Sequence, residues 1–224
     1  AELGVAIRPI TDLEAYREKL NSFVYHSGFV MKPVFAAAKQ APRRVIYCEG
    51  EDERTLRAVQ AVLDEGMAHP VLIGRPEVIE RRIKSAGLRL QAGRDIEIVN
   101  PDHDPRYKEL WQEYHRLLGR GGVTPSLAKL RMRADTTLIG SMLLRRSDVD
   151  AMICGTQGQL SRHLQHVNDV IGLRPNAHCF ATMNMLLLPR HTLFMCDTYI
   201  NEDPDAAQLA EITLMAADEV RRLG

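Results

Sequence analysis

The sequence predicts an α/β fold built on a parallel sheet. Short apolar segments alternate with longer segments whose apolar residues repeat at helical spacing, and residues 45–48, 70–74 and 96–99 form the strands of a strand-helix-strand-helix-strand series. Such a series favours parallel strands joined by right-handed helical crossovers. Hydrophobic residues make up 45% of the 224-residue chain and charged residues 26%, which is enough apolar material for a folded core.

Residues 1–41 are predicted to form a linker and helical adaptor. A helix is expected to open at residues 11–14, where apolar residues begin to recur at helical spacing. This helix is expected to end at Gly28, and a second short helix is expected over residues 33–40, with proline at its start.

The middle of the chain carries the predicted sheet. After the strand at residues 45–48, a helix is expected with Leu56 and Val59 on one apolar face, acidic residues in its first turn and Gly66 at its end. The further expected elements are, in order, a strand at 70–74, a helix at 77–86, a strand at 96–99, a helix at 106–118, a helix capped by Thr124, a helix at 136–145, a strand at 149–154 and a helix at 160–171.

A hinge is expected at Gly172. Two neighbouring strands and a helix are predicted over residues 177–223, and so small a set of elements cannot bury a core of its own. We therefore expect a first α/β lobe over residues 42–172 and the start of a second lobe over residues 173–224, in a chain that is interrupted rather than finished.

Charge and hydropathy exclude several classes of protein. The formal net charge is zero and the pI is about 7.3, which argues against a nucleic-acid-binding surface. No apolar run reaches the roughly 20 residues of a membrane-spanning helix, and the amino end lacks a secretory signal. The scattered cysteines form no zinc-binding CxxC pattern. These features favour a cytoplasmic protein, or a piece of one.

Two predicted strand ends carry polar groups at the edge where parallel sheets bind ligands. They are residues 49–51 and residues 154–158, and the second set is the stronger candidate. Its small and polar residues let backbone N–H groups and the start of the next helix face an anion. The residues alone leave open the alternative of an ordinary strand-to-helix turn.

Other motifs carry weaker indications. The chain has no Walker motif, no GxGxxG and no GxSxG, and residues 119–122 are interpreted as a loop rather than a phosphate cradle. His163, His166 and Asp169 share a helix face and have the chemistry of metal ligands. No further ligand completes such a site, so a histidine pair on the surface or in a cleft is the favoured interpretation, and no metal is expected.

Several motifs resemble those of the phosphate acetyl/butyryl transferases. Residues 50–59 follow a short strand, and residues 70–74, 122–125 and 149–155 come after them in the order seen in that family. The resemblance covers the chain from about Arg43 onward. It implies a three-layer α/β/α fold with a parallel sheet, into which a second lobe is inserted.

A narrower resemblance is to the carboxyl-terminal transacetylase-like domain of the large bacterial NADP-dependent malic enzymes. It rests on residues 5–10, 15–17, 114–116 and 169–175, the first of which resembles the linker from the malic domain. It implies a parent enzyme that oxidatively decarboxylates malate to pyruvate with NADP and Mg or Mn. No cofactor is expected to bind to the present fragment.

Two departures from the acetyltransferase pattern imply that this fragment does not transfer acetyl groups. The serine, arginine and aspartate that serve catalysis in the family lie in a part that this chain lacks. The phosphate-binding arginine of the family is replaced by Gln165, whose amide supplies no fixed charge. Arg162, one turn earlier, is a candidate to compensate, and Arg116 is similar to a second family arginine.

The resemblance implies a regulatory and assembly domain that senses acetyl-CoA in the cleft between the lobes. The alternatives are an active phosphate acetyl/butyryl transferase and a purely structural oligomerisation domain. The expected partners are acetyl-CoA, the malic catalytic domain of the same polypeptide and further copies of the chain, with no nucleic acid and no membrane. The residues expected to face acetyl-CoA are Arg116, Gly155, Thr156, Arg162, His163, Gln165 and His166.

Overall fold

The computed structural model describes residues 12–188 and 191–223. The chain divides into two compact units, of which one is Ala37–Leu173 and the other comprises Ala1–Ala36 with Arg174–Gly224. Each unit is described by itself below.

The unit Ala37–Leu173 is built on a parallel sheet, as predicted. Its strands are β1 (Arg43–Tyr47), β2 (Ala68–Ile73), β3 (Glu97–Val99) and β4 (Ala151–Ile153), in the order β3-β2-β1-β4. Every pair of neighbours is parallel, with Tyr47 opposite Leu72 on one side and opposite Ile153 on the other. Strand β1 is therefore central, and its carboxyl end lies beside that of β4.

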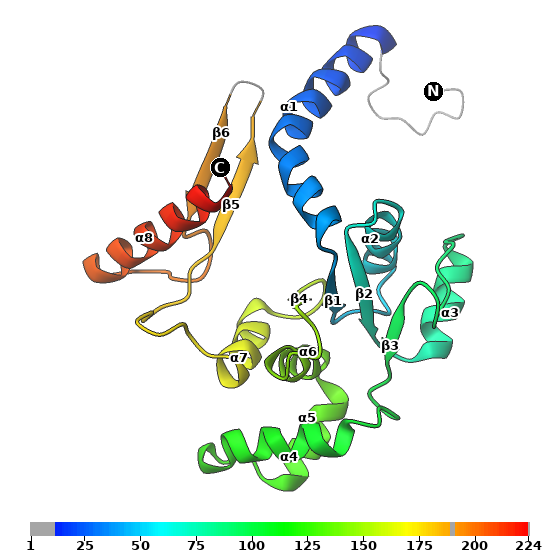
Figure 1. Cartoon of the computed structure of the whole chain (residues 1–224). Coiled ribbons are helices and arrows are strands. Elements are labelled where there is room, and N and C mark those ends of the chain that lie inside the picture. Colours follow the sequence, from blue (N-terminus) through cyan, green and yellow to red (C-terminus); the bar gives the residue numbers. More distant parts are fainter. Residues whose placement is uncertain (1–11, 189–190, 224) are drawn as a thin grey trace. The chain divides into compact units, whose positions relative to one another are not determined.

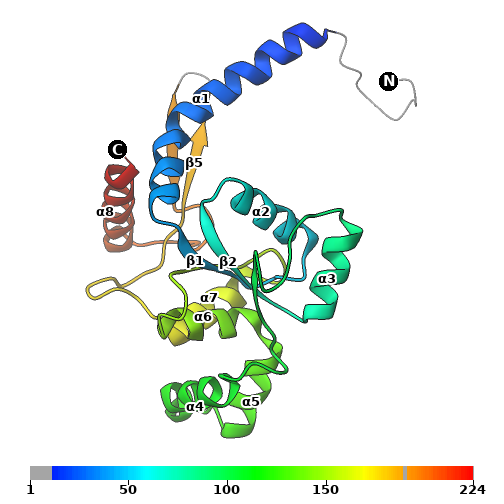
Figure 2. The same cartoon turned by 45° about the vertical axis from the view of Figure 1, so that its right-hand side comes forward.

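Helices cover both faces of this sheet and give it three layers (Figures 1 and 2). The alternation of side chains along a strand explains why two separate cores form. Tyr47 and Leu72 pack into one core with apolar residues of α2 (Glu53–Asp64) and α3 (Pro76–Ser85). Ile46 and Ile73 pack into the opposite core with further residues of the strands and with apolar residues of the helices that follow β3.

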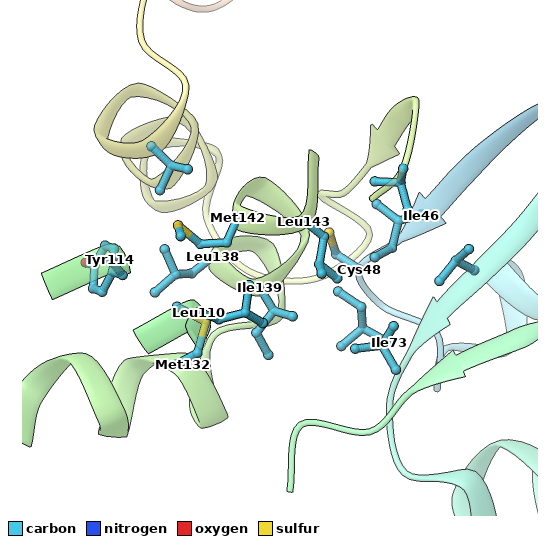
Figure 3. Close-up of a cluster of buried hydrophobic side chains, with 14 of the residues drawn as sticks. Ile46, Cys48, Ile73, Leu110, Tyr114, Met132, Leu138, Ile139, Met142 and Leu143 are labelled. Carbon is cyan, nitrogen blue, oxygen red and sulfur yellow. The ribbon is translucent and has the colours of Figure 1, made fainter. Parts of the chain in front are cut away.

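The second core is the larger one, and α6 (Thr136–Arg145) lies at its centre. Leu138, Ile139, Met142 and Leu143 of this helix are buried there (Figure 3). The surrounding elements are α4 (Tyr107–Leu118), the 3₁₀ turn η1 (Gly119–Gly121), α5 (Pro125–Ala134) and α7 (Leu160–Val170). Helix α6 is apolar on most of its surface, so it lies between the sheet and other helices, which shield that surface from water.

The predicted helix boundaries of this unit hold to within a few residues. Asp52 caps α2 through a hydrogen bond from the amide of Arg54, and Gly66 follows that helix with a φ of 65°. Thr124 caps α5 by accepting a hydrogen bond from the amide of Leu127, as expected. The fourth strand is shorter than predicted and begins at Ala151, because Asp150 instead pairs its amide and carboxylate with the backbone of Arg44.

The expected break in the first helix is wrong. A single helix, α1 (Leu13–Gln40), runs through Gly28 and holds Pro33 inside it. An interior glycine costs a helix only about 1 kcal/mol relative to alanine, whereas an interior proline costs about 3 kcal/mol and kinks a helix or breaks it. Neither residue interrupts a helix of 28 residues. The proposed opening residue Thr11 lies outside the described residues.

Arg174–Gly224 contains the two further strands and the helix. Strands β5 (Met183–Leu187) and β6 (Thr192–Cys196) pair in antiparallel fashion. Both strands are shorter than the predicted segments 177–188 and 191–198. Helix α8 (Ala206–Leu223) follows, and Ile212 is its buried residue. None of the helices among the described residues combines the length and apolar character that crossing a bilayer requires.

Candidate functional site

A pocket of about 350 Å³ opens beside the carboxyl ends of β1 and β4, where the sequence places its stronger candidate site. We call it the histidine pocket. Its walls come from the loop after β1, the junction of α5 and α6, the loop after β4 and the first turns of α7. The residues that line it are Glu49, Ala134, Asp135, Thr136, Thr137, Gln157, Gly158, Arg162, His163 and His166.

The loop after β4 is tied to the end of β1. The amide of Gly155 donates a hydrogen bond to Oε1 of Glu49 at 2.9 Å, and the carbonyl oxygen of Thr156 accepts one from the Arg54 guanidinium at 3.0 Å. Gly155 has a φ of 105°, a conformation that a side chain would disfavour. Gly155 and Thr156 thus shape the edge of the pocket through their backbone atoms.

Asp52 is the centre of this network. It is only 8% exposed, and its carboxylate accepts hydrogen bonds from the backbone and guanidinium of Arg54 and from Nε2 of Gln157 at 2.9 Å. These bonds, first of all that from Arg54, hold the pKa of Asp52 below its usual range. Asp52 therefore joins the start of α2 to the wall of the histidine pocket. From the sequence, Asp52 is recognisable only as an acidic residue that favours the start of a helix. Its bond to Gln157 is not predictable, because the two residues are 105 positions apart.

His163 is held by two hydrogen bonds. Its Nε2 lies 2.7 Å from the carbonyl oxygen of Gln157, and its Nδ1 lies 2.7 Å from Oγ1 of Thr137. A carbonyl oxygen only accepts, so Nε2 is the nitrogen that donates. In the neutral ring, Nδ1 then accepts from the Thr137 hydroxyl, and the imidazole fastens α7 to α6.

His166 lines the same pocket without such partners. It is 7% exposed, and neither of its ring nitrogens makes a hydrogen bond within the described residues. Its Nε2 is 3.8 Å from Oδ1 of Asp135, and burial lowers its pKa. A buried polar group without a partner is costly to the fold. A ligand that offers a hydrogen-bonding group here would recover that cost.

Arg162 is the only arginine or lysine among the described residues that line the pocket. Its guanidinium forms an ion pair with Asp135, whose side chain is 12% exposed. Asp135 also precedes α6, and the first two residues of that helix, Thr136 and Thr137, line the pocket. The helix start favours an anion, whereas the carboxylates of Glu49 and Asp135 oppose one. The pocket is therefore mixed in charge.

The residues predicted to face a ligand divide into three groups. Arg162, His163 and His166 line the histidine pocket, and Gly155 and Thr156 shape its edge. Gln165 and Arg116 are exposed and do not line the pocket. Residues three apart share a helix face, so His163 and His166 face inward together while Gln165 lies on another side of α7. Their role in ligand binding stays a prediction.

A second pocket of about 260 Å³ lies at the ends of β1 and β2, near the weaker candidate segment 49–51. Glu51 accepts hydrogen bonds from the Arg75 guanidinium at 2.9 Å, and these bonds lower the pKa of Glu51. Arg133 also lines this pocket. The sequence does not indicate either arginine as a site residue, because one lies in the β2–α3 loop and the other on α5.

Metal binding finds no support from the arrangement of side chains. Over residues 12–188 and 191–223, no three His, Cys, Asp or Glu residues converge in a way that could hold a metal ion. His163 instead uses both ring nitrogens for hydrogen bonds within the protein.

Solved structures with the same architecture include two phosphotransacetylases. The EutD phosphotransacetylase from Staphylococcus aureus superposes with a TM-score of 0.76 at 20% identity, over 87% of this chain and 58% of that one. A phosphotransacetylase from Streptococcus pyogenes also gives a TM-score of 0.76, at 22% identity, over 86% of this chain and 59% of that one. At these identities the likeness shows the fold alone.

Curated relatives include malic enzymes. The chain is 50% identical to the NAD-dependent malic enzyme of Rhizobium meliloti and 49% identical to the NADP-dependent malic enzyme of Escherichia coli, each over 100% of this chain and 29% of the relative. The phosphate acetyltransferase of Escherichia coli is 29% identical over 84% of this chain and 26% of the relative. The chain thus spans less than a third of the length of these relatives.

The family comparison agrees with the broader of the two resemblances seen in the sequence, and the curated relatives agree with the narrower one. The Phosphate acetyl/butaryl transferase family matches residues 29–224, which is most of the chain. The match begins within α1 and takes in both compact units. The chain belongs to the Phosphate acetyl/butaryl transferase family and corresponds to a part of the bacterial malic enzymes.

Proposed function

We propose that this chain is the acetyl-CoA-sensing, regulatory and assembly domain of an NADP-dependent malic enzyme, and that it does not itself transfer acetyl groups. Identities of 50% and 49% to malic enzymes over the whole chain, against 29% to a phosphate acetyltransferase, support the malic enzyme as the parent. In this proposal the parent uses NADP and Mg or Mn outside the present chain, is cytoplasmic and assembles into oligomers. Residues 42–172 form the ligand-binding lobe.

The observation that carries the proposal is the ion pair between Arg162 and Asp135. Stabilising a phosphoryl group during acetyl transfer calls for a guanidinium that is available to the phosphoryl oxygens. Arg162 is the single arginine among the described lining residues, and Asp135 neutralises it. A pocket of this kind is better suited to binding a ligand than to stabilising extra negative charge in a transition state.

The same pocket retains groups that would recognise a ligand. His166 has an unpartnered ring within the described residues, and Thr136 and Thr137 at the start of α6 line the same pocket. A carbonyl or phosphate oxygen of acetyl-CoA would satisfy these groups, and Arg162 would exchange Asp135 for the ligand. Such an exchange would move α7 relative to α6, and a coupling free energy of about 1 to 3 kcal/mol to a distant site is typical of regulation.

Calorimetric titration of the intact protein with acetyl-CoA tests this assignment. The wild type should bind, and Arg162→Ala should weaken binding by at least about tenfold, since a charge-assisted hydrogen bond is lost. Arg57→Ala is the matched control, because Arg57 is similarly exposed and pairs with Glu53 on α2, away from the pocket. Absence of binding up to millimolar acetyl-CoA would refute the sensing role.

An active phosphate acyltransferase is the second candidate, and the 29% identity to phosphate acetyltransferases favours it. It predicts formation of acetyl-CoA from acetyl phosphate and CoA by the intact protein. Our proposal predicts no such formation by the wild type. Asp135→Asn releases Arg162 from its ion pair, so it is the variant in which a trace of acetyl transfer is most expected. Gln165→Arg places its charge on an exposed position outside the pocket, so it is not expected to restore transfer.

A further inference from the structure

Two cysteines lie side by side at the carboxyl ends of β1 and β4. The strands pair in register with Ile46 opposite Met152 and Tyr47 opposite Ile153, so the next residues in line are Cys48 and Cys154. The pairing continues this far, because the amide of Cys48 donates to the carbonyl oxygen of Ile153 at 3.0 Å. Neighbouring strands are about 4.8 Å apart, which is within the Cα separation of about 4.4 to 6.8 Å that a disulfide spans.

Both thiols are on the face of the sheet that α6 covers. A Cβ atom at Gly140 of α6 would lie 2.8 Å from Sγ of Cys48, and Cys154 packs against the same core (Figure 3 shows Cys48). Each thiol shifts the pKa of the other, as expected for neighbours. The in-register backbone and the shared face therefore place the two cysteine side chains next to one another.

The two cysteines differ in their access to solvent. Cys48 is fully buried, whereas Cys154 is partly exposed. The neighbouring Cys48 thiol lowers the pKa of Cys154 to about 7. Cys154 is thus the thiol that solutes reach and that ionises near neutral pH, and Cys48 is the thiol behind it.

We propose that Cys48 and Cys154 form a redox-active dithiol, which low-molecular-weight disulfides oxidise to an intramolecular disulfide. The Cys154 thiolate attacks one sulfur of the small disulfide, forms a mixed disulfide and releases the first thiolate, which takes up a proton from solvent. The Cys48 thiol then loses its proton and attacks the sulfur of Cys154, and the second small thiol departs. Two protein thiols are oxidised and one small disulfide is reduced to two thiols.

The disulfide would act on the histidine pocket through the chain itself. Cys48 directly precedes Glu49, and Cys154 directly precedes Gly155, and the hydrogen bond between these two residues ties the pocket edge together. A covalent link one residue away would fix the spacing of the two strand ends. The dithiol assignment rests on the cysteines alone and stands whether or not the pocket binds acetyl-CoA.

The test treats the intact protein with an excess of glutathione disulfide and maps the products by peptide mass spectrometry under non-reducing conditions. The wild type should yield a peptide pair cross-linked through Cys48 and Cys154. Cys48→Ser, which replaces the resolving thiol with a hydroxyl of similar size, should instead hold a stable glutathione adduct on Cys154. Cys154→Ser should leave Cys48 unmodified because that thiol is buried.

A second readout does not depend on the disulfide. At pH 7, iodoacetamide should alkylate Cys154 in the wild type, because a pKa of about 7 leaves a substantial part of this partly exposed thiol as thiolate. Cys196→Ser is the control variant and should oxidise like the wild type. An unmodified Cys154 in folded Cys48→Ser, or a wild type without the 48–154 cross-link after prolonged treatment, would overturn the proposal.

Discussion

His166 shows how one side chain can report on the state of the site. Its ring is buried and lines the histidine pocket, has no hydrogen-bond partner within the described residues and lies 3.8 Å from the Asp135 carboxylate. Burial disfavours the charged ring and lowers its pKa, although the Asp135 carboxylate opposes this effect. The neutral ring is therefore the form that the fold selects.

The pH dependence of stability should reveal this selection. The unfolded chain takes up a proton at His166 below about pH 6.5, the ordinary pKa of histidine, and the folded chain does so only at lower pH. The free energy of unfolding should therefore fall as the pH drops below that value, by up to about 1.4 kcal/mol per pH unit for one proton. Urea titrations from pH 8 to pH 5 measure this slope.

His166→Gln should remove that part of the slope, because glutamine does not titrate. His103→Gln is the matched control, because it makes the same substitution at an exposed histidine in the loop after β3. Equal slopes in the wild type and in His166→Gln would show that His166 does not titrate in the way its burial implies.

Asp52 supports a second prediction at the same scale. Asp52→Ala removes both the cap of α2 and the carboxylate that holds Arg54 and Gln157. We expect it to lower the free energy of unfolding by about 1 to 3 kcal/mol. Glu53→Ala, which removes only an exposed pair with Arg57, should stay within about 0.5 kcal/mol of the wild type. Urea unfolding at pH 7 compares the two, and equal losses would mean that Asp52 is no more than a surface charge.

At the scale of elements, the closeness of α6 to the sheet determines the shape of the site. Gly140 allows this helix to approach Cys48 and Met152, and the start of the helix then lies in the histidine pocket. A larger residue at position 140 would push the helix away from the strands. The geometry of the pocket therefore depends on a residue that does not line it.

Two glycine-to-alanine changes within helices should have opposite effects. Gly140→Ala places a Cβ atom 2.8 Å from two sulfur atoms, so we expect a loss of about 1 to 3 kcal/mol from overpacking. Gly28→Ala in α1 meets no atom within 4 Å and should stabilise the helix by about 0.5 to 1 kcal/mol. Unfolding monitored by circular dichroism distinguishes them, and a stabilised Gly140→Ala would contradict the close packing of α6.

The success of the sequence-based prediction also differs by element. The parallel sheet and its helices are predictable because their apolar residues repeat with the period of a strand or a helix. The break expected at Gly28 is wrong because local propensity decides little within a long helix. The spacing of His163 and His166 is enough to predict that they share one face of a helix. Asp135 and Asp52 could not be identified, because their partners Arg162 and Gln157 are 27 and 105 residues away.

At the scale of the whole molecule, the chain corresponds to a part of longer relatives. It covers 29% of the length of the malic enzymes to which it is similar, and it belongs to the Phosphate acetyl/butaryl transferase family. In our proposal the domain has kept a ligand pocket while Asp135 neutralises the arginine that acetyl transfer would use. The parent enzyme would then respond to acetyl-CoA without consuming it.

The most direct test is the rate of malate oxidation by the intact enzyme as acetyl-CoA is added. The account predicts a saturable change in rate or in apparent malate affinity, of about 5-fold to 150-fold in the latter if the coupling has the usual strength. The same titration with Arg162→Ala should need higher acetyl-CoA concentrations. A wild-type rate that stays constant from zero to millimolar acetyl-CoA would contradict the account.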